Sequence, residues 1–229
     1  MDIEIHAWRQ RSAVASKGYA STTVHNAVLE VLRSIGPSGS LLDFGAGVGA
    51  FAKELLVSFE VDKVVCADLL PRPDDLPEAV DWIQSDLNDS LPLPEASFSA
   101  ITAVEVIEHL ENPRAVFREL ARLLRPGGIL VLSTPNQESL RSYITLITSG
   151  HFAAFRDRSY PAHITALLRQ DFIRLCKETS FVAPNFRYAD VGRIPMLTSY
   201  CWQQFSCGLL RGRLFSDNLV IYTRKPCAP

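Results

Sequence analysis

Three closely spaced glycines between hydrophobic segments are the first feature of this chain that could do chemistry. The run LLDFGAGVGAF, residues 41–51, is typical of a buried strand, a tight turn and the first turn of a helix. Glycines at 45, 47 and 49 would let a ligand approach the backbone where a Cβ atom would clash. The helix that follows would direct its free N–H groups toward that ligand.

Asp43 indicates which ligand suits this turn. Gly45, Gly47 and Ala50 satisfy the loose G-x-G-x-x-G/A pattern of dinucleotide sites, such as those for NAD. Those sites have an apolar residue where this chain has Asp43, which leaves room for a pyrophosphate. A fixed carboxylate repels phosphate and favours ammonium or sulfonium charge, which indicates S-adenosylmethionine. The alternative interpretation is that Asp43 caps the turn and the glycines serve tight packing.

Three further short hydrophobic segments also end at an acid. Asp68 ends residues 63–68, Asp86 follows residues 82–85, and Glu105 ends residues 98–105. The carboxyl ends of parallel strands meet at one edge of a sheet, where open α/β sheets bind ligands. We expect Asp68 to accept hydrogen bonds from ribose hydroxyls, and Asp86 to accept one from an adenine amino group near the Leu87 backbone. The alternatives are a solvated acid for Asp68 and a helix or turn cap for Asp86.

At these motifs the chain resembles the class I S-adenosylmethionine-dependent methyltransferases. The matching pieces are LLDFGAGVGAF, VVCADL, IQSDLND, FSAITAVEVIEHLENP and ELARLLRPGGILVLSTPN, within about residues 40–136. The EVIEHL motif makes it most similar to the branch that includes the ubiquinone-biosynthesis O-methyltransferases. The resemblance implies an α/β fold with a Rossmann-like, seven-stranded, mostly parallel sheet flanked by helices, and an insert after strand 5. It also implies S-adenosyl-L-methionine as cofactor, bound by Asp43, Gly45, Ala46, Gly47, Gly49, Asp68, Leu69, Asp86, Leu87 and Val104.

The EVIEHL motif also carries the candidate catalytic residues, Glu105 and His109, with His163 further along the chain. On a helical start, residues 105, 108 and 109 would share one face. An imidazole could act as base for a hydroxyl acceptor because it titrates near neutral pH. In the resembling branch and in small-RNA 2′-O-methyltransferases, a similar set can hold a divalent metal such as magnesium, manganese or zinc. We favour a hydrogen-bonded His–Glu pair and assign no metal ligand.

The expected reaction is O-methylation of a small-molecule hydroxyl. The alternatives are N- or C-methylation of a natural-product intermediate, and a catalytically silent scaffold that keeps the cofactor fold. The net charge of −2 gives no general reason to bind nucleic acid. The five cysteines, with no Cys-x-x-Cys, are interpreted as reduced thiols. No signal peptide or continuous apolar span is predicted, so a cytoplasmic location is expected.

The elements that must position these residues fit one domain, residues 1–229. We expect an N-terminal cap and helix over 1–36, a cofactor-binding core over 37–136, an insert over 137–168, and C-terminal helix and strands over 169–229. Residues 1–20 lack clear periodicity, whereas 24–35 predict a helix with Thr22 or Thr23 as N-cap and Gly36-Pro37 as its end. Asn112-Pro113 predicts the start of another helix. In the resembling family the last strand, here residues 218–223, is antiparallel.

The insert breaks the alternation of strands and helices, and we expect it to be a mobile cover that carries substrate recognition. Beyond it, Leu197, Cys201, Phe205 and Leu209 are spaced by four, which favours a buried helical stripe. The alternative is an apolar wall beside a lipid-like or aromatic substrate. Residues 186–229 carry six basic and two acidic side chains. This excess favours a solvated face, with an anionic substrate or peripheral membrane contact as the minority interpretation.

Overall fold

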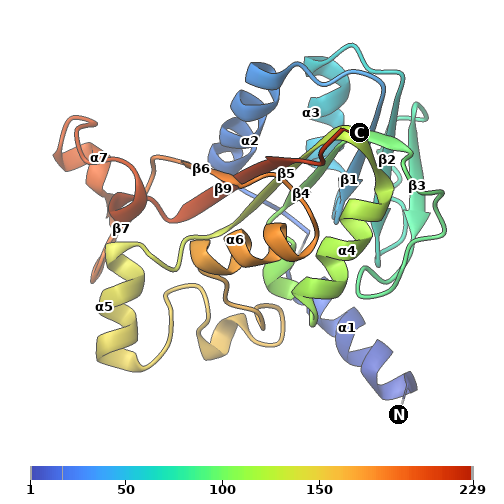
Figure 1. Cartoon of the computed structure of the whole chain (residues 1–229). Helices are drawn as coiled ribbons and strands as arrows, with labels where there is room; N and C mark the ends of the chain where they lie inside the picture. The colour runs from blue at the N-terminus through green and yellow to red at the C-terminus, as the bar shows by residue number, and fades with distance from the viewer. Residues whose placement is uncertain (1, 17, 228–229) are drawn as a thin grey trace.

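A seven-stranded sheet between helices forms the centre of this protein in a computed structural model that describes residues 2–16 and 18–227 (Figure 1). The strand order is β3-β2-β1-β4-β5-β9-β6. β9 pairs antiparallel with both β5 and β6, so the other six strands run in one direction. This confirms the predicted Rossmann-like sheet and its antiparallel last strand. The strands are β1 (Ser40–Phe44), β2 (Lys63–Asp68), β3 (Val80–Gln84), β4 (Phe98–Val104), β5 (Leu124–Pro135), β6 (Asn185–Tyr188) and β9 (Asn218–Arg224).

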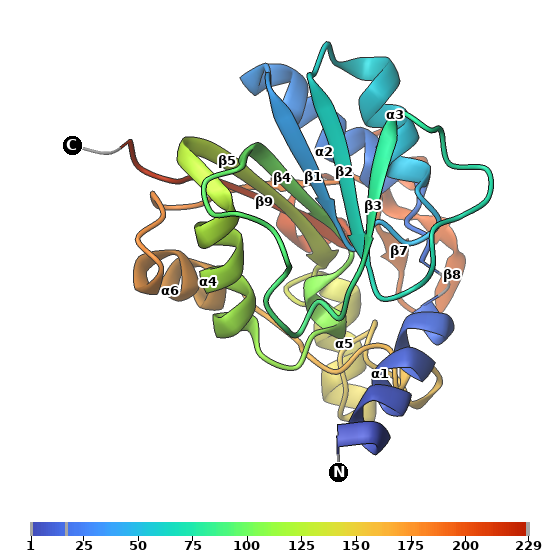
Figure 2. The same cartoon turned by 90° about the vertical axis from the view of Figure 1, so that its right-hand side faces the viewer.

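Helices cover both faces of the sheet and its carboxyl edge. α2 (Thr22–Ile35) and α3 (Ala50–Ser58) pack on one face, around Val28 and Leu55. α4 (Pro113–Leu123) and α6 (Arg169–Glu178) pack on the other, around Phe117 and Phe172. α1 (Asp2–Ser16) and α5 (Leu140–Ser149) lie beyond the carboxyl edge of the parallel strands (Figure 2). The short 3-10 helices are η1 (Ile107–His109), η2 (Asp157–Ser159) and η3 (Arg213–Phe215).

The helix ends show which cap predictions were right. α4 begins as expected, with the side chain of Asn112 accepting a hydrogen bond from the Ala115 N–H and proline in the first turn. α2 ends at Gly36, which is left-handed with φ of 68°. Its N-cap is Ser21 rather than Thr22 or Thr23, because the Ser21 hydroxyl accepts from the Val24 N–H at 3.4 Å.

Two segments differ from the sequence-based expectations. Residues 2–16, for which the sequence showed no clear periodicity, form α1. Much of this helix is exposed, so it carries no amphipathic stripe for periodicity to detect. The expected buried stripe is wrong, because β7 (Arg193–Ile194), β8 (Leu197–Cys201) and α7 (Trp202–Phe205) replace one continuous helix. A spacing of four then selects no common face, and Leu197 and Leu209 are 55% and 85% exposed.

Two further expectations from the sequence concerned membrane-spanning segments and the state of the cysteines. Among the described residues, no helix combines the length and apolar character needed to cross a membrane. Each of the five cysteines is unpaired, as predicted for reduced thiols.

Candidate cofactor and acceptor site

A cavity of about 550 Å³ opens at the carboxyl edge of β1, β2, β3 and β4, a size within the range of small-molecule sites. The sheet register brings the four expected acids to it: Asp43, Asp68, Asp86 and Glu105. Residues of α1 and the end of the insert cover it from the other side. Every predicted cofactor residue lines this cavity except Gly49. The parallel order of the strands therefore brings the four acids to one cavity, as expected from their positions at the strand ends.

The glycine turn is required by close packing as well as by ligand access. A Cβ on Gly45 would lie 2.4 Å from Cγ2 of Val106, and one on Gly47 would lie 2.2 Å from the Gly18 carbonyl oxygen. Gly49 precedes α3, where a Cβ would lie 2.5 Å from Cδ1 of Leu76. The packing interpretation therefore holds at all three glycines, and Gly45 and Gly47, unlike Gly49, also line the cavity.

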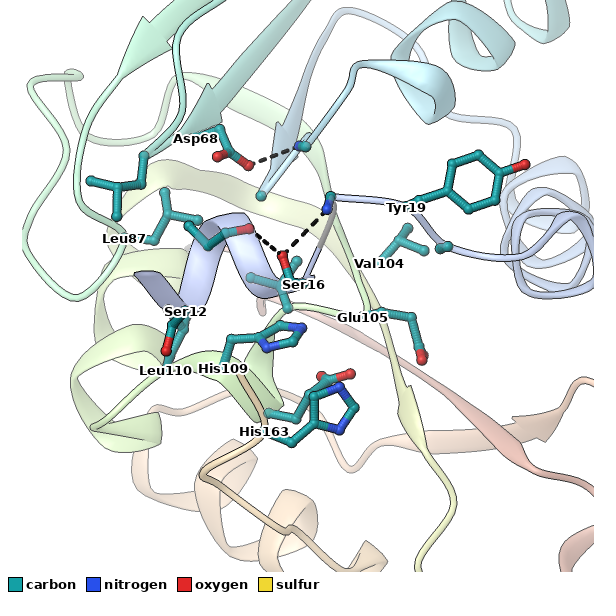
Figure 3. Close-up of a pocket in the computed structure, with 18 of the residues that line it drawn as sticks. Ser12, Ser16, Tyr19, Asp68, Leu87, Val104, Glu105, His109, Leu110 and His163 are labelled. Carbon is teal, nitrogen blue, oxygen red and sulfur yellow. Dashed lines mark hydrogen bonds between the residues drawn. The ribbon is translucent and has the colours of Figure 1, made fainter. Parts of the chain in front are cut away.

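Asp68 is fixed by the turn that it faces. Its Oδ2 accepts a hydrogen bond from the Gly47 N–H at 2.8 Å (Figure 3). Its Oδ1 accepts one from the Leu70 N–H at 2.9 Å. Burial raises the pKa of Asp68, and these N–H donors act against that rise. A carboxylate oxygen can accept more than one hydrogen bond, so both oxygens retain capacity for ribose hydroxyls.

Asp43 is almost fully buried, with 1% of its surface exposed. Its Oδ1 accepts a hydrogen bond from the Thr102 hydroxyl at 3.0 Å, whereas its Oδ2 has no partner among the described residues. Burial raises the pKa of Asp43 to about 7, the Thr102 bond opposes this, and the nearby charge of Asp68 adds to it. An unpartnered buried carboxylate oxygen beside the glycine turn fits the positively charged amino-acid portion of S-adenosylmethionine.

The two carboxylate oxygens of Asp86 accept hydrogen bonds from two different residues, a combination that the sequence did not predict. Its Oδ1 accepts hydrogen bonds from the N–H and side-chain amide of Asn88, both at 3.0 Å, so it does cap a turn. Its Oδ2 accepts from Arg9 Nη1 at 3.0 Å, and Arg9 also donates to both carboxylate oxygens of Glu111. Partial burial acts to raise the pKa of Asp86, but Asn88 and Arg9 together lower it. Arg9 therefore holds α1 across the cavity. The sequence did not reveal Arg9 because it lies in a segment without clear periodicity.

His109 and His163 form the floor of the cavity, with ring centroids 4.9 Å apart (Figure 3). The Nδ1 of His109 lies 2.8 Å from the Ala162 carbonyl oxygen and must donate to it, because a carbonyl only accepts. This leaves the lone pair on Nε2. Burial lowers the pKa of His109, and lowers that of His163 to about 4.

The end of the insert is hydrogen-bonded directly to η1. The Glu108 carbonyl accepts from the N–H groups of Ile164 and Thr165, both at 2.9 Å, and the Thr165 hydroxyl donates to the Leu110 carbonyl. The Ser12 hydroxyl of α1 donates to the Pro161 carbonyl at 2.6 Å. His163 is therefore already held beside His109 in this structure.

Three residues near this floor could hold a metal ion. Ligand atoms of Glu108, His109 and His163 lie within 4.8 Å of one another. Glu108 is fully buried and accepts from the Thr134 hydroxyl, while its Oε1 and the Nδ1 of His163 have no partner among the described residues. Two unpartnered atoms and a fixed imidazole fit a Glu-His₂ site with an open position.

Glu105 does not join this set, although the sequence placed it on the same face. Its carboxylate accepts hydrogen bonds from Ser133 at 3.0 Å and Asn218 at 2.9 Å. Glu105 has a left-handed backbone with φ of 56°, before η1 begins, so helical spacing does not apply to it. Figure 3 shows its side chain directed away from the two imidazoles. Burial, with the nearby Glu108 charge, raises the pKa of Glu105 to about 8.

Comparison with known proteins defines the class. Residues 15–183, most of the chain, match a family model described as a methyltransferase domain. Together with the sheet and the acid-lined glycine turn, this match shows that the chain belongs to the class I S-adenosylmethionine-dependent methyltransferase family.

The names of similar curated proteins differ in how much of the reaction they specify. A ubiquinone biosynthesis O-methyltransferase of Xanthomonas oryzae is 32% identical over 104 residues, covering 42% of this chain and 44% of that protein. A “Probable S-adenosylmethionine-dependent methyltransferase” of Mycobacterium tuberculosis is 32% identical over 137 residues, covering 60% and 45%. The matched part thus spans about half the length of these curated relatives.

Solved structures support the fold at lower identity. A Thermotoga maritima S-adenosylmethionine-dependent methyltransferase, described as a possible histamine N-methyltransferase, has a TM-score of 0.61 and 17% identity, covering 88% and 91% of the two chains. The [4+2]-cyclase SpnF also has a TM-score of 0.61, with 18% identity, covering 89% and 82%. A fold shared by a methyltransferase and a cyclase does not itself define the reaction.

Proposed function

We propose that this protein transfers the methyl group of S-adenosylmethionine to a hydroxyl oxygen of a small-molecule acceptor. The observation that carries this proposal is His109, whose Nδ1 donates to Ala162 and whose Nε2 is left as a proton acceptor in the same cavity as the cofactor residues. The name of the Xanthomonas relative, a ubiquinone biosynthesis O-methyltransferase, supports the choice of oxygen.

The chain's contribution is alignment and proton removal. S-adenosylmethionine supplies an electrophilic methyl group for a one-step in-line displacement. Asp43 orients the amino-acid portion, Asp68 holds the ribose, and Leu69 and Leu87 border the adenine. Such alignment is worth about 7–11 kcal/mol in well-oriented systems. As the acceptor oxygen takes the methyl group, the S–CH₃ bond would break and S-adenosylhomocysteine would leave, while Nε2 of His109 takes the hydroxyl proton; such proton removal typically contributes about 10²–10⁴-fold.

A metal-assisted route is the alternative, and the unpartnered atoms of Glu108 and His163 favour it. A divalent ion held by Glu108, His109 and His163 would lower the pKa of an acceptor hydroxyl. His109 would then be a ligand rather than the base. Dialysis against EDTA, followed by addition of Zn²⁺, Mg²⁺ or Mn²⁺, separates the routes, because the base route predicts unchanged methyl transfer after chelation.

A radiolabelled methyl-transfer screen over phenols, sugars, amines and RNA tests the proposal. We expect transfer to hydroxyl compounds and a loss of about 10²–10⁴-fold in His109→Ala. His151→Ala is the matched control, since His151 lies in the insert and does not line the cavity. Transfer confined to amines would refute the hydroxyl acceptor. Binding of S-adenosylhomocysteine without transfer to any acceptor class would support a silent scaffold instead.

A further inference from the structure

Between β6 and β9 the chain leaves the sheet and forms a separate unit, residues 191–216, which we call the C-terminal excursion. β7 and β8 pair only with each other, and α7 and η3 follow them. Figure 1 shows β7 and α7 at the left end of the molecule, on the side opposite β3. The excursion therefore presents a surface that the main sheet does not cover.

The excursion is held firmly from within. The ring of Trp202 packs edge-on against Phe215, with centroids 5.5 Å apart. The side-chain amide of Gln203 donates to the carbonyls of Leu210 and Phe215, at 2.7 and 2.9 Å, and its oxygen accepts from the Gly192 N–H at 3.0 Å. Because Trp202 and Gln203 make these inward contacts, the backbone that carries the outward side chains is fixed in place.

The outward side chains are large and apolar. Met196, Leu209 and Phe205 are 96%, 85% and 65% exposed, and Leu197 and Tyr200 are each about half exposed. The rings of Tyr200 and Phe205 contact each other, with centroids 5.6 Å apart. Single exposed apolar residues are ordinary on a soluble protein, but five of them within residues 196–209, two of them in ring contact, favour an interaction site.

The charges of the excursion point to an anionic occupant. Residues 191–216 contain Arg193, Arg211 and Arg213 and no acidic residue. Arg211 donates to the Gly208 carbonyl at 2.7 Å, and Arg213 lies 3.8 Å from Glu138. A second copy docked symmetrically on this face would bring like charges together. Exposed aromatic and aliphatic groups beside arginines instead match the headgroup region of an anionic bilayer.

We propose that the C-terminal excursion docks this protein on an anionic lipid bilayer. Met196, Phe205 and Leu209 enter the headgroup region, while Arg211 and Arg213 meet the lipid phosphates. Arg193 both begins the excursion and lines the cavity, and its N–H donates to Asp217 at 3.3 Å. The docked surface therefore adjoins the cavity, where an amphiphilic acceptor could enter; this last point rests on the proposed function.

Co-sedimentation of the whole protein with vesicles tests the docking. We expect binding to vesicles of phosphatidylglycerol and phosphatidylcholine, none to phosphatidylcholine alone, and weaker binding at 0.5 M salt because salt screens the arginines. The double variant Met196→Ser/Leu209→Ser should bind at least tenfold more weakly, and Arg211→Ala a few-fold more weakly. Val57→Ser, at an apolar residue 91% exposed on α3, and Arg33→Ala on α2 are matched controls that should bind as the wild type does.

Two results would overturn the inference. The first is failure of the wild type to sediment with anionic vesicles, or an equal loss in the control variants. The second is a dimer in light scattering that the double variant abolishes, with no vesicle binding, which would make a second copy the occupant. Calorimetry with S-adenosylhomocysteine checks that each variant is folded. Vesicle binding in a protein that methylates nothing would leave the docking standing and remove only the proposed function.

Discussion

Asp43 lies in an environment that differs strongly from that of an ordinary carboxylate. Burial raises its pKa to about 7, well above the usual value near 4. The folded protein therefore holds a proton that the unfolded chain has lost, so the free energy of unfolding falls as pH rises from about 4 to about 7. In the cofactor-free protein, the buried ionised carboxylate of Asp43 therefore lowers the folding stability. We attribute this destabilisation to a site prepared for a cation.

Asp43→Asn should remove that destabilisation. Three pKa units correspond to at most about 4 kcal/mol, and we expect the variant to gain about 1–3 kcal/mol at pH 8, since asparagine is also polar and buried. The gain should shrink toward pH 4, while affinity for S-adenosylmethionine falls. Denaturant unfolding from pH 4 to 8 measures this, with the exposed Asp89→Asn as control. Parallel stability curves for wild type and Asp43→Asn would contradict the assignment.

Asp68 offers a second test at the residue scale. Asp68→Ala removes the acceptor for the Gly47 and Leu70 N–H groups and, under the proposed function, for the ribose hydroxyls. We expect cofactor affinity to fall by about 1–3 kcal/mol, the scale of losing hydrogen bonds to a charged group. Calorimetry with S-adenosylmethionine, S-adenosylhomocysteine and NAD provides the measurement. Tight NAD binding with no response to the other two would instead favour the dinucleotide interpretation of the glycine turn.

At the scale of elements, two side chains attach α1 to the rest of the protein: Ser12, which donates to the Pro161 carbonyl, and Arg9. Arg9 joins it to Asp86 on the cofactor edge and to Glu111 beyond η1. Because the Arg9 side chain is partly exposed, we expect Arg9→Ala to loosen α1 by only about 1 kcal/mol. Amide exchange over residues 4–16 should then quicken about fivefold, and S-adenosylhomocysteine should dissociate faster.

The control for this prediction lies on the same helix. Arg11 stacks over Trp8, with its guanidinium carbon 5.2 Å from the ring centroid, so Arg11→Ala removes a charge from α1 without touching Asp86. An equal effect of both variants on exchange would show that charge on α1, rather than the Arg9 contact, holds the helix.

The insert stays a predicted cover, and its anchors suggest how it would move. The hydrogen bonds of Ala162, Ile164 and Thr165 tie its end to η1. We therefore expect residues 140–158 to exchange faster in the empty protein than β1 and β5, and to slow with cofactor and product bound. Residues 162–165 should stay protected in both states. Protection of 140–158 equal to that of the two strands would show a cover that does not move.

The sequence predicted the elements whose signal is local. A few adjacent residues are enough to predict the helix start at Asn112-Pro113, the helix end at Gly36 and the hydrophobic strands. The parallel order of the strands then brings four acids together. The contacts of Arg9 with Asp86 and of His109 with Ala162 join segments 77 and 53 residues apart. No local pattern encodes such pairings. Spacing also misled where it assumed a continuous helix, at Glu105 and in the C-terminal excursion.

At the scale of the whole molecule, the continuous sheet supports the prediction of a single domain. β1 pairs on both sides, with β2 and β4, and one packed core lies on each face. The strands β1, β4 and β5 each contribute buried residues to both cores, which makes cooperative unfolding the expected behaviour. The C-terminal excursion is the part least connected to these cores, because β7 and β8 pair outside the sheet.

We therefore expect one calorimetric transition for residues 1–229. S-adenosylhomocysteine at a hundred times its Kd should stabilise the folded state by about 2.7 kcal/mol, which for a chain of this size raises Tm by roughly 5–10 °C. The transition should move as a unit, since the cavity joins the ends of four strands with α1 and the insert. An early second transition, lost in a protein lacking residues 193–215, would mean that the excursion unfolds separately and that the single-domain prediction fails. Unchanged Tm with this ligand would instead contradict the cofactor assignment, because any ligand that binds only the folded state must raise it.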